Sequence, residues 1–326
     1  MKTRESVVLV TGGLGYIGGH VVDDLLARGW RVRILDNHYR SDPRVEQRLS
    51  GYSEVEIIEG DVRYPNTVDR VMPGVEGVVH LAAVCINKSI SEPAESLDVN
   101  LVGSQNVFDA AARHGVRRLV FASSASVYGN PTSMPMYEDS VLAPITPYCI
   151  AKAASEQLLK FYGSRSRMAW VALRFFNVYG PGQPTDAYYT SVILTFLRRM
   201  MAGEPPVIDG DGAQSMDFVH VADVARAVGM ALDSEVTGEI LNVGTGRQTT
   251  VAELAHSLAG AVGMDITPQF RPREVLVTQR EASVERIHDV LNWQPEVEMA
   301  EGLASVVEHM RATGALAGDS AAAGIG

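Results

Sequence analysis

A glycine-rich turn follows the first apolar run of the chain. The run covers residues 7–11, and the turn Gly12-Gly13-Leu14-Gly15-Tyr16-Ile17-Gly18 leads into a helical pattern that ends at Gly29. Glycines let the backbone turn tightly and approach a pyrophosphate, whose charge the free N–H groups of a helix N-terminus stabilise. Asp36 ends the next apolar run, 18 residues after Gly18, where a carboxylate can accept hydrogen bonds from both adenosine ribose hydroxyls. The pattern predicts a βαβ unit that binds a dinucleotide, and Asp36 favours NAD because it would repel the 2′-phosphate of NADP.

Short β-branched runs alternate with helical patterns through the N-terminal half. Alternation of this kind implies parallel strands, right-handed crossovers and helices on both faces of the sheet. The expected fold class is therefore α/β, a doubly wound parallel sheet of the Rossmann type with a second, smaller, discontinuous α/β domain. The expected strands cover residues 7–11, 31–36, 56–59, 77–81, 117–122 and 169–174.

The pattern changes near Val178, where prolines and glycines become frequent. Helical patterns follow at about residues 189–201, 222–232, 251–262 and 300–311, and the apolar run 239–243 could rejoin the sheet. We expect residues 1–177 plus about 218–245 to form the NAD-binding domain. Residues of about 178–217 plus 246–313 would form the smaller domain, and the Ala/Gly-rich tail 314–326 would be frayed.

Charge and cysteine content exclude several classes of protein. The net charge of −11 disfavours binding to nucleic acid or to an anionic membrane. Only two cysteines occur, Cys85 and Cys149, so a disulfide framework is not expected and a reducing compartment fits. No apolar run approaches the ~18 residues of a membrane span, and the eight histidines show no metal-ligand cluster. A cytoplasmic enzyme without a metal is the expectation.

Tyr148 and Lys152 stand four residues apart, on one face if the segment is helical. A phenol has a pKa near 10, and a nearby ammonium together with a nicotinamide cation would favour its ionised form. Such a phenolate could take a proton from a substrate hydroxyl while hydride leaves the same carbon for the nicotinamide. The spacing is equally compatible with a surface helix whose lysine is solvated.

A serine-rich segment, Ser123-Ser124-Ala125-Ser126, follows the strand expected at residues 117–122. Ligands bind at the carboxyl edge of a parallel sheet, so a hydroxyl here could contact the reacting oxygen. A simple turn explains the serines equally well.

Together with Arg174-Phe175-Phe176-Asn177-Val178-Tyr179-Gly180-Pro181, these motifs occur in an order that resembles extended short-chain dehydrogenase/reductases. Over about residues 6–310 the chain is most similar to NAD-dependent nucleotide-sugar epimerases and dehydratases, particularly UDP-hexose 4-epimerases. The resemblance implies that Tyr148, Lys152 and Ser124 are catalytic and that the smaller domain binds the nucleotide sugar. It assigns the cofactor to Gly12, Gly15, Tyr16, Ile17, Gly18, Asp36, Asn37, Asp61, Val62, Leu81, Ala82, Ala83, Asn100, Ser123, Tyr148 and Lys152.

Departures from the family pattern indicate the reaction. Sugar dehydratases carry an Asp-Glu pair where this chain has Ala125 and Ser126, and decarboxylases usually carry Glu at the place of Ser126. The resemblance therefore implies C4 epimerisation of a UDP-hexose through a transient 4-keto sugar, with NAD retained. UDP-Glc/UDP-Gal would be the pair, with UDP-GlcNAc/UDP-GalNAc as a further one. The alternatives are an NDP-4-ketosugar reductase and a uronic acid 4-epimerase.

The resemblance also implies substrate contacts and a partner. Met216 stands where the family usually has a phosphate-binding Arg, the small Thr278 would admit N-acetylated sugars, and Pro184 with Thr185 makes a uronic acid less expected. A homodimer would pack residues 99–114 and 148–162 of each subunit into a bundle. The substrate-binding residues so implied are Ser124, Tyr148, Asn177, Arg271, Glu274 and Thr278.

Overall fold

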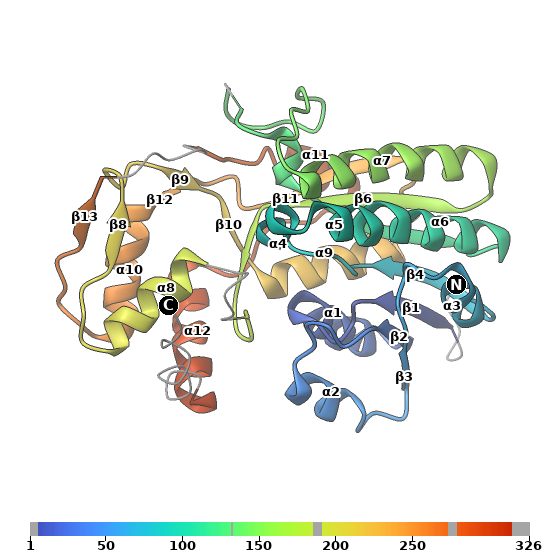
Figure 1. Cartoon of the computed structure of the whole chain (residues 1–326), viewed down its shortest axis with the longest axis horizontal. Helices are drawn as coiled ribbons and strands as arrows, with labels where there is room; N and C mark the ends of the chain where they lie inside the picture. The colour runs from blue at the N-terminus through green and yellow to red at the C-terminus, as the bar shows by residue number, and fades with distance from the viewer. Residues whose placement is uncertain (1–5, 132, 185–190, 273–278, 315–326) are drawn as a thin grey trace.

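A computed structural model describes residues 6–131, 133–184, 191–272 and 279–314 (Figure 1). Seven parallel strands form one sheet in the order β11-β6-β5-β4-β1-β2-β3. The doubly wound parallel sheet is thereby confirmed, and β11 rejoins it beside β6. The strands are β1 (Val7–Thr11), β2 (Arg31–Asp36), β3 (Val55–Glu59), β4 (Val75–His80), β5 (Arg118–Ser124), β6 (Ala169–Phe175) and β11 (Glu239–Val243).

Helices cover both faces of this sheet because successive strand residues point to opposite sides. In β1, Val8 and Val10 belong to one buried cluster, whereas Leu9 belongs to the other. The first cluster takes in α1 (Tyr16–Ala27) and α9 (Val221–Asp233), and the second takes in α6 (Ser104–Arg113) and α7 (Pro147–Arg165). Around them lie α2 (Pro43–Leu49), α3 (Pro65–Val71), α4 (Ile86–Ser91), α5 (Pro93–Leu97), a π-helical turn (Asp98–Gly103) and a 3₁₀ turn (Ala125–Tyr128).

A third buried cluster belongs to the smaller part of the chain, left of the sheet in Figure 1. It gathers apolar side chains from α8 (Val192–Met201), α10 (Val251–Val262) and α12 (Met299–Thr313). Three short strand pairs accompany this third cluster: β7 (Asn177–Tyr179) with β10 (Phe218–His220), β8 (Val207–Asp209) with β13 (Gln269–Arg271), and β9 (Ser215–Met216) with β12 (Thr249–Thr250).

No helix in the described ranges is both long and apolar enough to cross a membrane.

One helix of the expected second segment packs elsewhere. Helix α11 (Glu285–Leu291) contacts β11, and its Ile287 and Leu291, with Trp293, join the first cluster of the large sheet. The expectation that all of 246–313 belongs to the smaller domain is therefore wrong for this helix. Its short apolar pattern does not say which of two cores it fills, so the sequence alone could not decide it.

His80 is fully buried at the end of β4. Its Nδ1 lies 2.6 Å from Thr11 Oγ1 and its Nε2 lies 3.0 Å from Ser104 Oγ. The Ser104 hydroxyl donates to Asn100 O, so His80 Nε2 must donate to Ser104 and Nδ1 must accept from Thr11. Burial lowers the pKa of His80 to about 3, helped by the charge of Lys152. The fold therefore holds a neutral imidazole.

The free energy of unfolding should fall as the pH drops below 6.5. In that range the unfolded chain binds a proton at His80 and the folded chain does not, so acid favours unfolding, by about 2 kcal/mol at pH 5 from this group. Urea unfolding at pH 7.5 and pH 5 measures the change. His80→Gln should reduce the difference between the two pH values, whereas the exposed His288→Gln should not. An equal pH dependence in all three proteins would contradict the assignment.

Candidate active site

A cavity of about 650 Å³ lies where the strands of the large sheet end. Turns after β1, β2, β4, β5 and β6 line it, and Met216 and Phe218 line it from the smaller part of the chain. The cavity thus spans both parts of the fold. Of the residues named from the sequence, it brings together Gly12, Gly15, Tyr16, Ile17, Gly18, Asp36, Asn37, Asp61, Val62, Leu81, Ala82, Ala83, Ser123, Ser124, Tyr148, Lys152 and Asn177.

Two expected site residues that the structure describes do not line the cavity. Asn100 is buried beside it: its amide donates to Val84 O at 3.0 Å and accepts from Val84 N at 2.8 Å, so it positions a lining residue. Arg271 is largely exposed and pairs with Asp209. Asn100 thus acts on the cavity through Val84, and the contact expected between Arg271 and the substrate stays a prediction. Glu274 and Thr278 lie outside the described residues.

The glycine turn has no room for a side chain at Gly12 or Gly18. Gly12 has a φ of +72°, and a Cβ added at Gly18 would lie 2.1 Å from Gly12 O. Because Gly18 has no Cβ, the first turn of α1 can pack closely against Gly12. The N–H groups of the first helical residues can then face a phosphate. Tyr16, Ile17 and Gly18 of that first turn line the cavity. The arrangement fits a dinucleotide pyrophosphate.

Asp36 is held at the end of β2 by two backbone donors. Leu14 N donates to Oδ2 at 3.0 Å and His38 N donates to Oδ1 at 2.9 Å. Burial raises the pKa of Asp36, and the two N–H groups partly offset that effect. Each oxygen keeps a lone pair, so the carboxylate can still accept ribose hydroxyls, as the sequence predicts.

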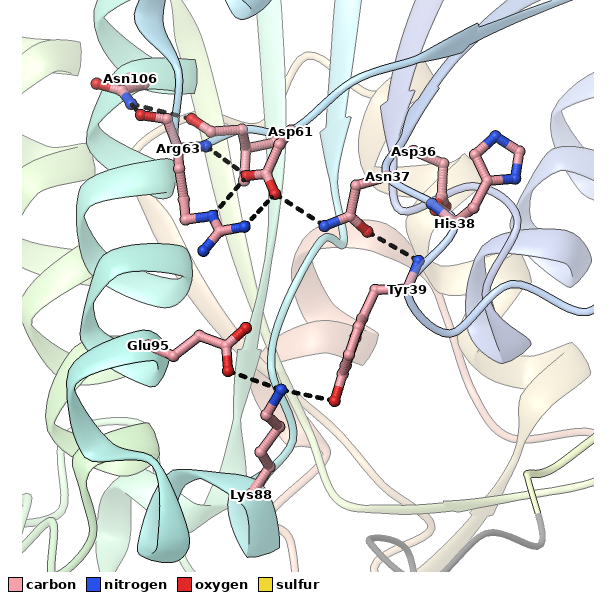
Figure 2. A network of polar contacts seen from close by, with 10 residues as sticks. Asp36, Asn37, His38, Tyr39, Asp61, Arg63, Lys88, Glu95 and Asn106 are labelled. Carbon is pink, nitrogen blue, oxygen red and sulfur yellow. Dashed lines mark hydrogen bonds and ion pairs between the residues drawn. The ribbon is translucent and has the colours of Figure 1, made fainter.

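A polar network ties the loop after β2 to its neighbours (Figure 2). Asn37 Nδ2 donates to Asp61 Oδ2 at 2.9 Å. Farther along, Lys88 Nζ donates to Tyr39 Oη at 2.6 Å and pairs with Glu95 Oε2 at 2.6 Å. Four of the five residues in these contacts line the cavity. The fifth, Lys88, lies behind them and is 5 % exposed. The network holds the cavity wall next to Asp36, where the adenosine ribose is expected to bind. The contacts of Lys88 with Tyr39 and Glu95 were not predicted from the sequence.

Tyr148 and Lys152 lie in the first turns of α7, whose N-terminus is capped by the Thr146 side chain. Lys152 is only 2 % exposed; its Nζ donates to Ala122 O at 2.7 Å and lies 5.8 Å from the Tyr148 ring centre. A solvated surface lysine, the alternative left open by the spacing, is therefore excluded. Burial lowers the pKa of Lys152 to about 7 against the opposing Glu156 carboxylate. Lys152 thus exchanges its proton near neutral pH instead of holding a permanent charge.

Ser124 ends β5 beside this pair and also lines the cavity. Its Oγ accepts hydrogen bonds from Ser126 N at 3.2 Å and from Ser126 Oγ at 2.9 Å. A hydroxyl that accepts from two donors keeps its own hydrogen for a third partner. Ser124 can therefore donate to a substrate oxygen.

A buried ion pair supports the site from below. Arg174 donates to Glu156 through Nε at 2.9 Å and Nη2 at 2.7 Å, and Ser123 Oγ donates to Glu156 Oε1 at 2.6 Å. Both charged side chains are at most 3 % exposed. Glu156 stands four residues after Lys152 on α7, a spacing that could have identified it.

Arg280 lines the cavity and was not predicted from the sequence. Its Nη2 lies 3.4 Å from Gly129 O, just past the 3₁₀ turn that begins after Ser124. Met216, where the family usually carries Arg, lines the cavity as well.

These features define a dinucleotide enzyme of the extended short-chain dehydrogenase/reductase class: the glycine turn, Asp36, and Tyr148 beside the buried Lys152 at the edge of a parallel sheet. The sequence model of the NAD dependent epimerase/dehydratase family matches residues 8–244. The chain belongs to the NAD-dependent epimerase/dehydratase family, and NAD is its cofactor.

Several relatives cover nearly all of the chain. A UDP-glucose 4-epimerase of Mycolicibacterium smegmatis is 36% identical over 93% of this chain and 98% of its own length, and a putative UDP-glucose 4-epimerase of Methanocaldococcus jannaschii is 33% identical over 94% and 98%. The structure of the Thermotoga maritima UDP-glucose 4-epimerase with UDP-glucose superposes with a TM-score of 0.88 at 34% identity, covering 94% of this chain and 99% of that one. The family relationship is thus to UDP-sugar 4-epimerases.

Proposed function

We propose that the protein interconverts the C4 epimers of a UDP-hexose through a transient 4-keto sugar, with NAD retained throughout. The observation that carries the proposal is the buried Lys152 beside Tyr148 and Ser124 at one end of a cavity with room for cofactor and sugar. Ala125 and Ser126 offer no acid–base pair for dehydration. UDP-glucose 4-epimerases among the relatives support the choice.

The proposed chemistry assigns one task to each side chain. Tyr148 Oη takes the proton from the sugar O4 and later returns it, and Ser124 Oγ donates a hydrogen bond to the same oxygen. Lys152, held by Ala122 O, favours the ionised phenol whenever it is protonated. When bound, NAD supplies the oxidation at C4 and its reversal on the opposite face. The smaller domain would hold the nucleotide end of the substrate.

A homodimer in the cytoplasm completes the proposal. Apolar side chains stand exposed along the elements that would form the bundle: Val102 is 43%, Ile150 48% and Phe161 48% exposed. Exposed apolar groups on adjacent helices are typical of subunit contacts.

A ketosugar reductase on the same scaffold is the second candidate, because the same residues would serve it. Incubation with UDP-Glc, UDP-Gal, UDP-GlcNAc and UDP-GlcA, each without added NAD, separates the two. We expect at least one sugar to reach equilibrium with its C4 epimer with no net change in NADH absorbance. Absence of every epimer, or a change in NADH absorbance in proportion to the product formed, would contradict the proposal.

A further inference from the structure

Arg280 lines the cavity from a segment that lies beside the smaller part of the chain. Its backbone N donates to Ser215 O at 3.0 Å, which anchors it beside β9, while its guanidinium lies 3.4 Å from Gly129 O, just past the 3₁₀ turn. The side chain therefore lines the cavity between the smaller part of the chain and the turn that follows β5.

The charge of Arg280 is not balanced by the protein. Within the described ranges no carboxylate lies within ion-pair distance of its guanidinium, and its one hydrogen bond, to Gly129 O, is long at 3.4 Å. Arg174 by contrast pairs with Glu156, Arg226 pairs with Asp223, and the fully buried Arg118 is held by the backbone carbonyl of Val236. Burial lowers the pKa of Arg280, against a weak opposing effect of Cys149. A cation enclosed in a cavity without a partner is costly unless a ligand supplies the anion.

The position of Arg280 in the cavity indicates which part of the substrate would carry that anion. Gly129 closes the 3₁₀ turn that begins after Ser124, and Cys149 directly follows Tyr148. Arg280 thus approaches the end of the cavity where C4 reacts. Arg271, an arginine expected to contact the substrate, is largely exposed and pairs with Asp209.

We propose that the hexose bears a carboxylate at C6, next to the reacting carbon through C5, and that Arg280 recognises it. This inference rests on the proposed function and narrows its substrate class to UDP-hexuronic acids. The fork of an arginine matches a carboxylate in a bidentate contact. A neutral CH₂OH group would leave the guanidinium without an anion. The sequence had made uronic acids less expected because Pro184 and Thr185 supply no cation, and Arg280 supplies one from another element.

Steady-state kinetics on UDP-GlcA/UDP-GalA and UDP-Glc/UDP-Gal test the proposal in the wild type, Arg280→Met and Arg280→Lys. We expect the wild type to favour the uronates by at least about 30-fold in kcat/KM, and Arg280→Met to lose a similar factor for uronates alone, mainly through KM. Arg280→Lys should retain part of the preference, since it keeps the charge without the fork. Arg271→Met is the matched control and should change both sugar classes by the same factor.

Bound NAD and the thermal unfolding midpoint of Arg280→Met show whether it folds. If that variant weakens neutral sugars, uronates and UDP equally, Arg280 binds the diphosphate and the proposal is overturned. It is also overturned if the wild type epimerises neutral sugars but does not favour uronates. If the wild type epimerises neither class, the proposed function itself has failed.

Discussion

Replacing Tyr148 with phenylalanine is expected to lower kcat by about 10³-fold, because a positioned general base contributes roughly 10²–10⁴-fold to proton transfer. The variant removes one oxygen and leaves the ring beside Lys152 in place. Binding of NAD should persist, since the glycine turn and Asp36 hold the other end of the cofactor. The measurement is the rate of C4 epimer formation, together with the NAD released on denaturing the purified variant.

Tyr162→Phe is the matched control for this prediction. Tyr162 lies on the same helix but packs against the second core cluster and is absent from the cavity lining. Its loss of a hydroxyl should leave kcat within about twofold of the wild type, as expected for a partly exposed site away from the chemistry. Near-normal turnover by Tyr148→Phe would show that another group moves the proton.

Glu156→Gln should give the largest loss of stability among single substitutions near the site. The change leaves the Arg174 guanidinium buried without its carboxylate, and breaking a buried pair in this way costs about 3–5 kcal/mol. It also removes the carboxylate that opposes the lowering of the Lys152 pKa, so that pKa should fall further. Denaturant unfolding measures the first effect, and the pH profile of kcat measures the second.

A double variant separates the missing charge from the missing contact. Glu156→Gln combined with Arg174→Met removes both charges and should recover part of the lost stability. The exposed pair Arg199–Glu204 provides the contrast, because Glu204→Gln should cost less than about 1 kcal/mol. Equal losses in the free energy of unfolding for Glu156→Gln and Glu204→Gln would contradict the claim that burial makes the Arg174–Glu156 pair costly to break.

The large sheet could be predicted from the sequence because its information is local. Each strand is a short β-branched run, and the glycine turn needs only neighbouring residues to be recognised. The placement of α11 could not be predicted in this way, since both cores accept an apolar helical face. Its assignment depends on the tertiary contact with β11.

Site residues that belong to a sequence motif could be predicted. Site residues whose role depends on burial in the folded chain could not. The spacing of Tyr148 and Lys152 left two interpretations open, and only the packing of α7 against β5 buries the lysine. Arg280 has no motif at all. It enters the cavity because residues 279 and 280 lie alongside Ser215, a long-range contact that spacing does not report.

The fate of the hydrogen at C4 tests the central claim most directly. A UDP-sugar carrying deuterium at C4, from the class that the enzyme turns over, is incubated in ordinary water without added NAD, and the C4 epimer is isolated. Hydride transfer within one closed site predicts that the epimer retains deuterium at C4 in full. Epimer that carries hydrogen from the solvent at C4 would contradict the account.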